Sequence, residues 1–239
     1  MSRVAVLGAN GRMGRRVVSL VRADPALTLV AAVTHATDAA LGDTAEVPLV
    51  AVGPGCFGDA EVVVDFSLPG GVAAALDHLG TRALVSGTTG LDLQTEARRT
   101  AHAKRAPLLV AANFSAGIHL LHALVARASA ALPHASIEIV ETHHRHKRDA
   151  PSGTALFLAQ AAADPRRVDP ATIPTHALRG GDVVGDHTVW LLADGERIAL
   201  SHSATSRDTF AHGAVRAAAW IAGRPPGAYR MVDVLAGTI

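Results

Sequence analysis

The stretch Arg3-Val-Ala-Val-Leu-Gly-Ala-Asn-Gly-Arg-Met-Gly14 decides the fold of this chain. Residues 3–7 are a short apolar run with β-branched side chains, which is typical of a strand buried on both faces. Three glycines follow, and apolar residues at 17, 18, 20 and 21 then mark one face of a helix. A strand, a glycine turn and a helix in this order predict a dinucleotide-binding unit.

Each glycine of this turn has a physical role. Gly8 permits the tight turn, Gly11 lets the backbone approach a pyrophosphate, and Gly14 allows the helix to pack closely on the strand. The helix N-terminus presents free N–H groups and partial positive charge to the phosphates. The spacing is G-x-x-G-x-x-G rather than G-x-G-x-x-G, with Asn10 where a glycine could stand. A plain tight turn between strand and helix is the alternative.

Strand and helix patterns continue to alternate up to residue 115, with a loop and one short strand over 36–60. This alternation predicts a parallel, doubly wound sheet, which binds ligands beyond the C-terminal ends of its strands. Further strands are expected over 27–33, 61–66, 82–86 and 107–112, further helices from about 71 to 79 and over 91–104, and strand-end turns at 67–71, 87–90 and 113–115.

The end of the second strand bears on the choice of nicotinamide cofactor. A site that prefers NAD usually carries Asp or Glu there, for the ribose hydroxyls. Here the end is Thr34-His35, with no acid before Asp38. No charge at this end repels a 2′-phosphate, and His35 could help to hold one, so the sequence favours NADPH or dual use.

From Ala116 the pattern changes to that of a second domain. Residues 116–204 are expected to form an α+β domain on an open mixed sheet, while 1–115 and 205–239 form the Rossmann-like domain, on which the C-terminus packs back. Asp194-Gly195 is a strong hairpin signal. The expected elements are helices over 116–132, 151–163 and 209–222, strands over 136–141, 188–193 and 196–202, and a loop over 164–186.

Composition excludes several classes of protein. The chain has 239 residues, is 49% hydrophobic and 18% charged, and carries a net charge of +1. It is therefore globular rather than disordered, and general nucleic-acid or membrane-surface binding is not expected. No apolar run reaches membrane-spanning length, and the N-terminus lacks a signal-peptide pattern. A single cysteine, Cys56, excludes an internal disulfide framework, which fits a cytoplasmic protein.

The stretch Glu141-Thr-His-His-Arg-His-Lys-Arg-Asp-Ala-Pro-Ser-Gly-Thr-Ala155 concentrates cations at the end of an expected strand. Such density is costly unless an anion is present. A metal site at His143, His144 and His146 is disfavoured, because neighbouring strand residues point to opposite faces and the adjacent cations repel a metal ion. A solvated surface run remains an alternative. No metal is expected.

The third interpretation is a pocket for an anionic substrate with a titratable donor. Histidine titrates near neutrality, and Lys147 can bind a carboxylate or deliver a proton. Ser152, Gly153 and Thr154 at a helix start offer donors to another carboxylate. A dinucleotide, a proton donor and a dicarboxylate together predict hydride transfer to an unsaturated diacid, followed by protonation.

The same stretch closely resembles the signature of the 4-hydroxy-tetrahydrodipicolinate reductase (dihydrodipicolinate reductase) family of lysine and diaminopimelate biosynthesis. The resemblance runs nearly end to end. It includes Val6–Gly14, Gly87-Thr-Thr-Gly90, Ala112-Asn-Phe-Ser-Ala-Gly117, Arg179-Gly-Gly-Asp-Val-Val-Gly-Asp-His-Thr188 and Ser206-Arg-Asp-Thr-Phe210. It implies NADPH or NADH as cofactor, a cyclic dicarboxylate as substrate, and a homotetramer built through the second domain's sheet.

The resemblance also implies roles for individual residues. His143 would be the proton donor and acceptor, Lys147 a second proton donor, and His144, Gly153 and Thr154 ligands of the substrate carboxylates. Family members often have an acid at the position of Thr34 and sometimes an Arg at that of His35, which leaves the cofactor preference open. The implied cofactor contacts are Gly8, Ala9, Asn10, Gly11, Arg12, Met13, Gly87, Thr88, Thr89, Ala111, Ala112, Asn113 and Phe114.

Two other functions stay open on the sequence. One is another two-domain NAD(P)-dependent dehydrogenase of a small dicarboxylate, which would be indifferent to pyridine-2,6-dicarboxylate. The other is a protein that senses NAD(P) without turnover, in which loss of Lys147 would leave function intact. The cationic stretch favours the reductase, since a sensor has no need of proton donors beside a diacid pocket.

Overall fold

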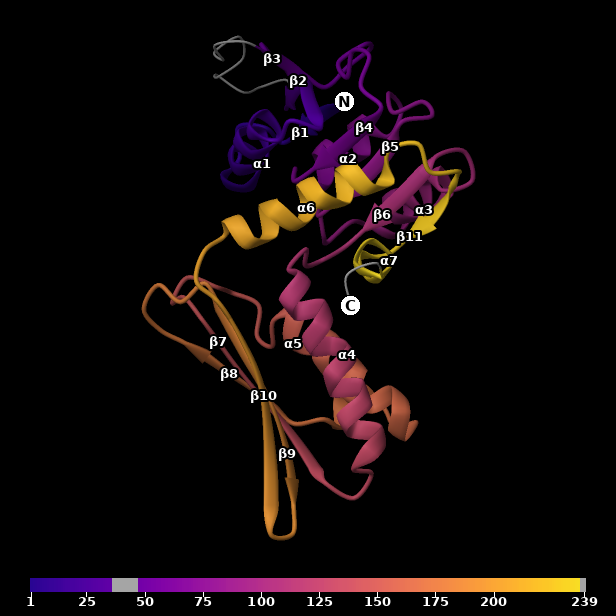
Figure 1. Ribbon diagram of the computed structural model, residues 1–239. Helices are drawn as coiled ribbons and strands as arrows, with labels where there is room; N and C mark the ends of the chain where they lie inside the picture. The colour runs from indigo at the N-terminus through magenta and orange to yellow at the C-terminus, as the bar shows by residue number, and fades with distance from the viewer. Residues whose placement is uncertain (36–46, 237–239) are drawn as a thin grey trace. The chain divides into compact units, whose positions relative to one another are not determined.

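The computed structural model describes residues 1–35 and 47–236, and the chain divides into two compact units (Figure 1). Unit 1 comprises Met1–Phe114 and Phe210–Ile239, and unit 2 comprises Ser115–Thr209. Asp38, the first acid after the second strand, lies outside the described residues. The functions that the sequence assigned to the two domains stay predictions.

Unit 1 contains a parallel sheet with the strand order β11-β6-β5-β4-β1-β2-β3. All residues of β4 and β5 are buried, as expected for strands covered on both faces. Within the described residues, these strands are β1 (Ser2–Leu7), β2 (Leu27–Thr34), β3 (Leu49–Ala51), β4 (Val62–Asp65), β5 (Ala83–Ser86), β6 (Pro107–Val110) and β11 (Gly227–Tyr229).

Helices pack on both faces of this sheet. One apolar cluster joins Val17 of α1 and Ala214 of α6 to the strands, and a second joins Val72 of α2 to the opposite side chains of the same strands. The doubly wound fold is thereby confirmed. The described helices of unit 1 are α1 (Arg12–Ala23), α2 (Pro69–Ala75), α3 (Leu93–His102), α6 (Asp208–Ile221) and α7 (Met231–Leu235).

Unit 2 is a mixed sheet with two helices on one face. Its strand order is β10-β9-β7-β8, in which β7 pairs parallel with β8 and antiparallel with β9. Helices α4 and α5 pack together against the inward side chains of β7 and β9 (Figure 1). The elements are α4 (Ala116–Ala131), β7 (Ser136–His143), α5 (Gly153–Ala163), short 3-10 turns η1 (Asp164–Arg166) and η2 (Pro170–Thr172), β8 (Thr175–Arg179), β9 (Gly185–Ala193) and β10 (Glu196–Ala204).

Two expectations for unit 2 were wrong. The segment 164–186 is not a loop, because it contains β8 and the start of β9. β8 has three exposed residues in succession, so it shows no alternation of apolar and polar residues, and its pairing with β7 defines it as a strand. Pro151 is not in the first turn of α5, since Ser152 is the N-cap and Pro151 precedes it.

The other expectations are confirmed with shifted boundaries. The hairpin at Asp194-Gly195 joins β9 to β10, and Gly195 has the positive φ of 83° that its turn requires. The C-terminal segment returns to unit 1, where β11 extends the sheet beside β6. None of the described helices has both the length and the apolar character needed to cross a membrane.

Candidate active site

The glycine turn of unit 1 has the geometry expected for close backbone approach. Gly8 has φ +78°, and a Cβ there would lie 2.7 Å from the Phe66 carbonyl oxygen. A Cβ at Gly14 would lie 2.0 Å from the Gly8 carbonyl oxygen, so only glycine lets α1 pack on the turn. Gly11 is the N-cap of α1 and has no side-chain cap, so the N–H groups of the first helical turn follow the glycine turn directly.

A cavity of about 520 Å³ opens beside this turn, and it lies within the size range of cofactor sites. It brings together the glycine turn, the end of β2 and the start of the turn after β5. It includes residues that sequence reasoning did not assign to the cofactor, among them Phe66 and Ser67. Of the predicted contacts, Gly8, Asn10, Gly11, Arg12, Met13, Thr34, His35 and Gly87 line it.

The remaining predicted cofactor residues do not line this cavity. Thr88 donates a hydrogen bond from its hydroxyl to the Ser67 carbonyl, at 3.0 Å, which ties the turn after β5 to the cavity wall. The Phe114 ring packs against Phe66, with 5.4 Å between the ring centroids, behind that wall. The other residues outside the lining are Ala9, Thr89, Ala111, Ala112 and Asn113.

The end of β2 is tied to the glycine turn by a side-chain hydrogen bond. The Thr34 hydroxyl donates to Asn10 Oδ1 at 2.7 Å, and Thr34 is buried while His35 is exposed. Asn10 thus supplies Thr34 with an acceptor that a glycine at position 10 could not supply. This hydrogen bond gives a structural reason for the G-x-x-G-x-x-G spacing.

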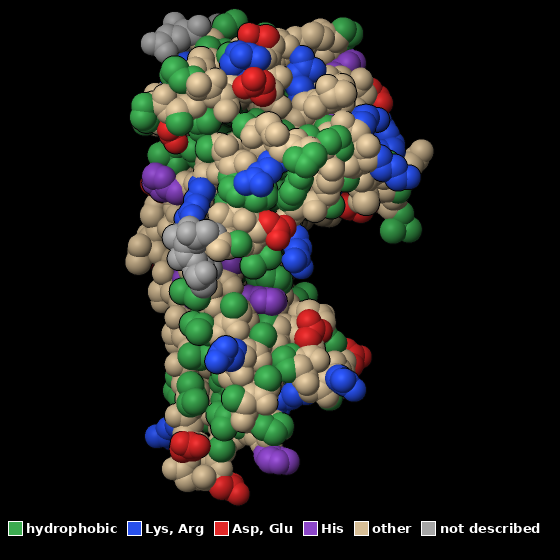
Figure 2. Space-filling model, turned by 45° about the vertical axis from the view of Figure 1, so that its right-hand side comes forward, with side chains coloured by type: hydrophobic (Ala, Val, Ile, Leu, Met, Phe, Trp, Pro, Cys, Tyr) green, Lys and Arg blue, Asp and Glu red, His purple; other side chains and the backbone are tan. Residues whose placement is uncertain are grey.

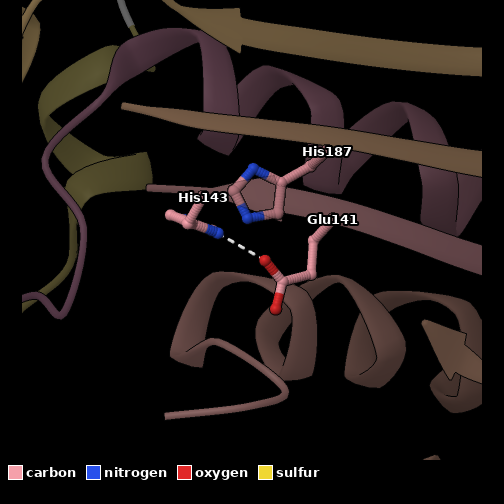
Figure 3. A group of neighbouring side chains, drawn as sticks. All are labelled: Glu141, His143 and His187. Atoms are coloured by element: carbon pink, nitrogen blue, oxygen red, sulfur yellow. Dashed lines mark hydrogen bonds and ion pairs between the residues drawn. The ribbon is translucent and has the colours of Figure 1, made fainter. Parts of the chain in front are cut away.

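In unit 2 the register of the sheet assembles a buried polar cluster. On β7, Glu141 lies opposite His187 of β9, and His143 lies opposite Arg179 of β8. Figure 3 shows Glu141, His143 and His187 gathered together, with the His143 Nδ1 edge directed at the Glu141 carboxylate. Glu141 has no exposed surface, and His143 and His187 are buried. Sequence reasoning missed Glu141 and His187 as members of the site.

The Glu141 carboxylate is fully engaged. Oε2 accepts from His143 Nδ1 and from Arg179 Nη1, the latter at 2.9 Å. Oε1 accepts from Arg179 Nη2 at 2.7 Å and from the Ser152 backbone N–H at 3.1 Å. Burial alone raises the pKa of Glu141, but the hydrogen bonds from Arg179 and His143 outweigh it and hold the pKa below its usual value.

The two histidines of this cluster titrate differently. Burial lowers the pKa of His143, and the hydrogen bond to Glu141 opposes that effect. Burial, together with the neighbouring His143, lowers the pKa of His187 to about 4. His187 is therefore neutral near pH 7, and its ring lies edge-on to His143 with 5.1 Å between the centroids. Of these two histidines, His143 is the one that has a hydrogen bond to the Glu141 carboxylate favouring its protonated form.

The start of α5 lies beside the same carboxylate. The Ser152 hydroxyl caps the helix by accepting from the Ala155 N–H at 3.1 Å, and it contacts His187 Nε2 at 3.3 Å. A Cβ at Gly153 would meet nothing within 4 Å, so this position faces open space. Ser152 is buried, whereas Gly153 and Thr154 begin the helix nearer the surface, where its partial positive charge can act on an anion.

One cation of the signature, Lys147, already pairs with an anion of the protein itself. The expectation that these cations require an external anion is therefore corrected. Lys147 Nζ pairs with Asp149 Oδ2 at 2.8 Å, and Arg179 donates to the Asp149 carbonyl at 2.6 Å. Burial raises the pKa of Asp149, but the hydrogen bond and charge of the Lys147 ammonium outweigh burial, so the net shift of the pKa is downward. Lys147 is half-buried, while Arg145 and Arg148 are exposed.

The sequence disfavours a metal site formed by His143, His144 and His146. The rings of His144 and His146 lie 6.3 Å apart, and His143 faces inward. Ligand atoms of Glu141, His143 and His187 do lie within 4.8 Å of one another. However, Arg179 donates to both oxygens of Glu141, and a guanidinium in that place opposes a cation. The absence of a resident metal stays a prediction.

Comparison with known proteins gives consistent matches over nearly the whole chain. A family model described as "Dihydrodipicolinate reductase, N-terminus" matches residues 2–114, and one described as "Dihydrodipicolinate reductase, C-terminus" matches residues 117–235. A 4-hydroxy-tetrahydrodipicolinate reductase of Halorhodospira halophila is 43% identical, covering 97% of this chain and 98% of that protein. One from Aquifex aeolicus is 42% identical, with 98% of each covered.

Solved structures show the same fold. A dipicolinate-bound dihydrodipicolinate reductase from Paenisporosarcina sp. TG-14 superposes with a TM-score of 0.76 at 24% identity, covering 98% of each chain. A diaminopimelate dehydrogenase from Corynebacterium glutamicum has a TM-score of 0.55 at 16% identity, covering 97% of this chain and 93% of that one. At these identities the likeness concerns the fold alone.

Proposed function

The chain belongs to the dihydrodipicolinate reductase family, and from this premise we propose which of its residues carry out the reaction. It is an NAD(P)H-dependent oxidoreductase of lysine and diaminopimelate biosynthesis. It reduces 4-hydroxy-tetrahydrodipicolinate to tetrahydrodipicolinate by hydride transfer and protonation, and the 4-hydroxyl group leaves as water. The residue assignment is supported by one observation: His143 is hydrogen-bonded to the buried carboxylate of Glu141, which also contacts the start of α5.

Unit 1 fits a nicotinamide dinucleotide, which supplies the hydride when bound. The glycines at 8 and 14 bring backbone close together, as a pyrophosphate site requires, and the cavity beside them has adequate volume. Thr34 would lie near the adenosine ribose, where it presents no negative charge to a 2′-phosphate. We therefore propose that NADPH is accepted, with His35 near its phosphate.

Unit 2 would supply the proton and bind the dicarboxylate. With Nδ1 of His143 donating to Glu141, Nε2 is the nitrogen that can give a proton to the substrate. Lys147 would release Asp149 and pair with a substrate carboxylate, or donate a proton itself. His144 and the start of α5, with Ser152, Gly153 and Thr154, would hold the other carboxylate.

The reaction is tested by following oxidation of NADPH with freshly generated substrate. We expect turnover by the wild-type protein and inhibition by pyridine-2,6-dicarboxylate, a planar analogue of the substrate. Lys147→Ala should cost roughly 2–5 kcal/mol of transition-state stabilisation, as other lost charge contacts do. His143→Ala should lower kcat.

The matched control is Arg148→Ala, which removes an exposed cation from the same stretch. It should retain activity to within a few fold. An inactive wild-type protein would refute the assigned reaction. Equal activities of the His143 and Arg148 variants would refute the assigned proton donor while leaving the reaction in place.

We also propose a homotetramer built through the open face of the unit 2 sheet. This face carries Leu178 and Leu192, both at least one-third exposed, and Trp190 lies between them in the register. Apolar side chains gathered on one sheet face favour burial against another copy of the same face. Light scattering would measure the mass. A cytoplasmic location is proposed because reduced nicotinamide cofactors are available there.

A further inference from the structure

The inward face of β7 changes character along its length. Residues 137, 139, 141 and 143 share this face because side chains alternate along a strand. Ile137 and Ile139 belong to the apolar core under α4 and α5, whereas Glu141 and His143 follow on the same face. A buried carboxylate is costly unless its partners compensate for the lost hydration, so its presence here calls for a specific role.

We propose that Glu141 is the positioning residue of the site. It fixes His143 with Nδ1–H toward the carboxylate and Nε2 toward the substrate, and its other oxygen holds the start of α5. The proposal rests on the assignment of His143 as proton donor. It goes beyond that assignment because it names the group that sets the orientation of the donor and couples it to the carboxylate-binding helix.

The contacts of Glu141 divide between these two tasks. Oε2 receives His143, and Oε1 receives the Ser152 N–H at 3.1 Å, which is the backbone of the α5 N-cap. Arg179 bridges the two oxygens with contacts of 2.9 and 2.7 Å. Two carboxylate oxygens with two donors each have little capacity left for water or another proton. Displacement of Glu141 would therefore disturb His143 and the helix start together.

The tautomer of His143 follows from the chemistry of its partner. An ionised carboxylate only accepts hydrogen bonds, so Nδ1 must carry hydrogen in the neutral ring. The lone pair is then on Nε2, and protonation adds the exchangeable proton there. Gly185 leaves room at this nitrogen, because a Cβ at residue 185 would lie 2.9 Å from Nε2.

The charges around His143 come from several elements. Glu141 raises its pKa, whereas burial, Lys147 of the following loop and Arg179 of β8 lower it. His187 of β9 is neutral near pH 7 and adds no positive charge at that pH. Glu141 is thus the group that keeps the His143 pKa from falling further, and its neutralisation should shift the titration of His143 to lower pH.

The wild-type protein alone provides a first test. Nitrogen-15 NMR of protein labelled at histidine distinguishes the two neutral tautomers, with His143→Gln used to assign the signal. We expect His143 as the Nδ1–H tautomer above its pKa. A His143 signal from the Nε2–H tautomer would overturn the proposal, and this outcome does not depend on which substrate the protein reduces.

Glu141→Gln provides the second test, because it keeps the shape and removes the charge. We expect a lower His143 pKa, loss of the single tautomer, and a fall in kcat on the order of 10- to 100-fold, the usual cost of losing a group that orients a functional histidine. The limb of the pH–rate profile that belongs to His143 should move to lower pH. Glu141→Asp, which keeps the charge, should recover part of both effects.

Glu138→Gln is the matched control. Glu138 lies on the same strand but on the other face, where it pairs with the partly exposed His176. Its substitution should leave the His143 signal and the profile unchanged. If Glu141→Gln lowered kcat with the His143 pKa and tautomer unaltered, Glu141 would be merely structural and the proposal would be wrong. A wild-type protein with the expected tautomer but no reductase activity would refute the proposed function instead.

Discussion

Removal of Arg179 would test how the buried cluster of unit 2 is held together. Arg179→Met keeps much of the volume of the side chain but leaves the Glu141 carboxylate, which has no exposed surface, without its bidentate partner. Breaking a buried ion pair by removing one partner costs about 3–5 kcal/mol, because the remaining charge stays dehydrated. His143 and the Ser152 N–H still contact Glu141, so we expect the lower part of this range, about 3 kcal/mol.

The loss should depend on pH in a defined direction. Without the guanidinium, burial raises the pKa of Glu141 above that of the unfolded chain. The folded variant then binds the proton more tightly than the unfolded chain, so its stability falls as pH rises through the raised pKa. The free energy of unfolding that Arg179→Met loses relative to the wild type should therefore be larger at about pH 8 than at about pH 5.

The assay is urea unfolding followed by tryptophan fluorescence. The chain has two tryptophans, Trp190 in unit 2 and Trp220 in unit 1. A Trp220→Phe background makes the signal report unit 2, which matters because two units need not unfold in one transition. Glu138→Gln is the control, since its ion pair with His176 is partly exposed and should contribute about 0–1 kcal/mol.

A double-mutant cycle with Glu141→Gln separates the pair from its surroundings. Because the variant with both changes removes both charges of this pair, it should be more stable than the sum of the two single losses predicts, with a coupling of roughly 1–3 kcal/mol. A loss below about 1 kcal/mol for Arg179→Met, or additive losses in the cycle, would refute the account of Glu141 as a charge held by Arg179.

Two further predictions concern acid stability and the glycine turn. Burial lowers the pKa of His187 to about 4 from an ordinary 6.5, so the unfolded chain takes up the proton first as the pH falls. The free energy of unfolding of unit 2 should therefore drop by about 3 kcal/mol between pH 6.5 and pH 4, and this group should cause no loss above pH 6.5. Urea midpoints over this range should fall less steeply for His187→Asn, and parallel slopes would contradict the assignment. Gly14→Ala places a Cβ 2.0 Å from the Gly8 carbonyl oxygen and should weaken NADPH binding at least 10-fold, roughly 1.4 kcal/mol, in a fluorescence titration. Gly70→Ala, whose Cβ would meet nothing within 4 Å, should bind normally; equal affinities for the two variants would argue against the packing role of Gly14.

Local patterns predicted unit 1 well because its elements are specified by neighbouring residues. The apolar run before Gly8 and the apolar face of α1 are visible in a short window. β4 and β5 are each an apolar run of three residues that ends in one polar residue, Asp65 or Ser86. The cavity beside the glycine turn also follows from this pattern, since the ends of parallel strands meet at one edge. Its outer wall, with Phe66 and Ser67, depends on how later turns pack against the first.

The buried cluster of unit 2 was not predictable in this way. β8 is an edge strand with little apolar alternation, and it is defined by pairing with β7 and by the contact from Arg179 to Glu141. His187 is identified as a neighbour of Glu141 only when β9 is aligned opposite β7. The cationic stretch was recognised from its composition, but the pairing of Lys147 with Asp149 depends on the folded path of the loop after β7.

The cross-strand pairs at Glu141 also bear on which changes in chain length this unit can accept. Glu141 faces His187, and His143 faces Arg179, only in the register that the sheet adopts. A single-residue deletion inside β7 or β9 would turn every following side chain to the opposite face and separate these partners. Insertions and deletions should therefore be tolerated in the exposed connection between η1 and η2 (residues 167–169) or at the Asp194-Gly195 hairpin tip, and rejected within the strands. Differences in length among proteins of this family should then fall outside β7 and β9, the strands that carry the site.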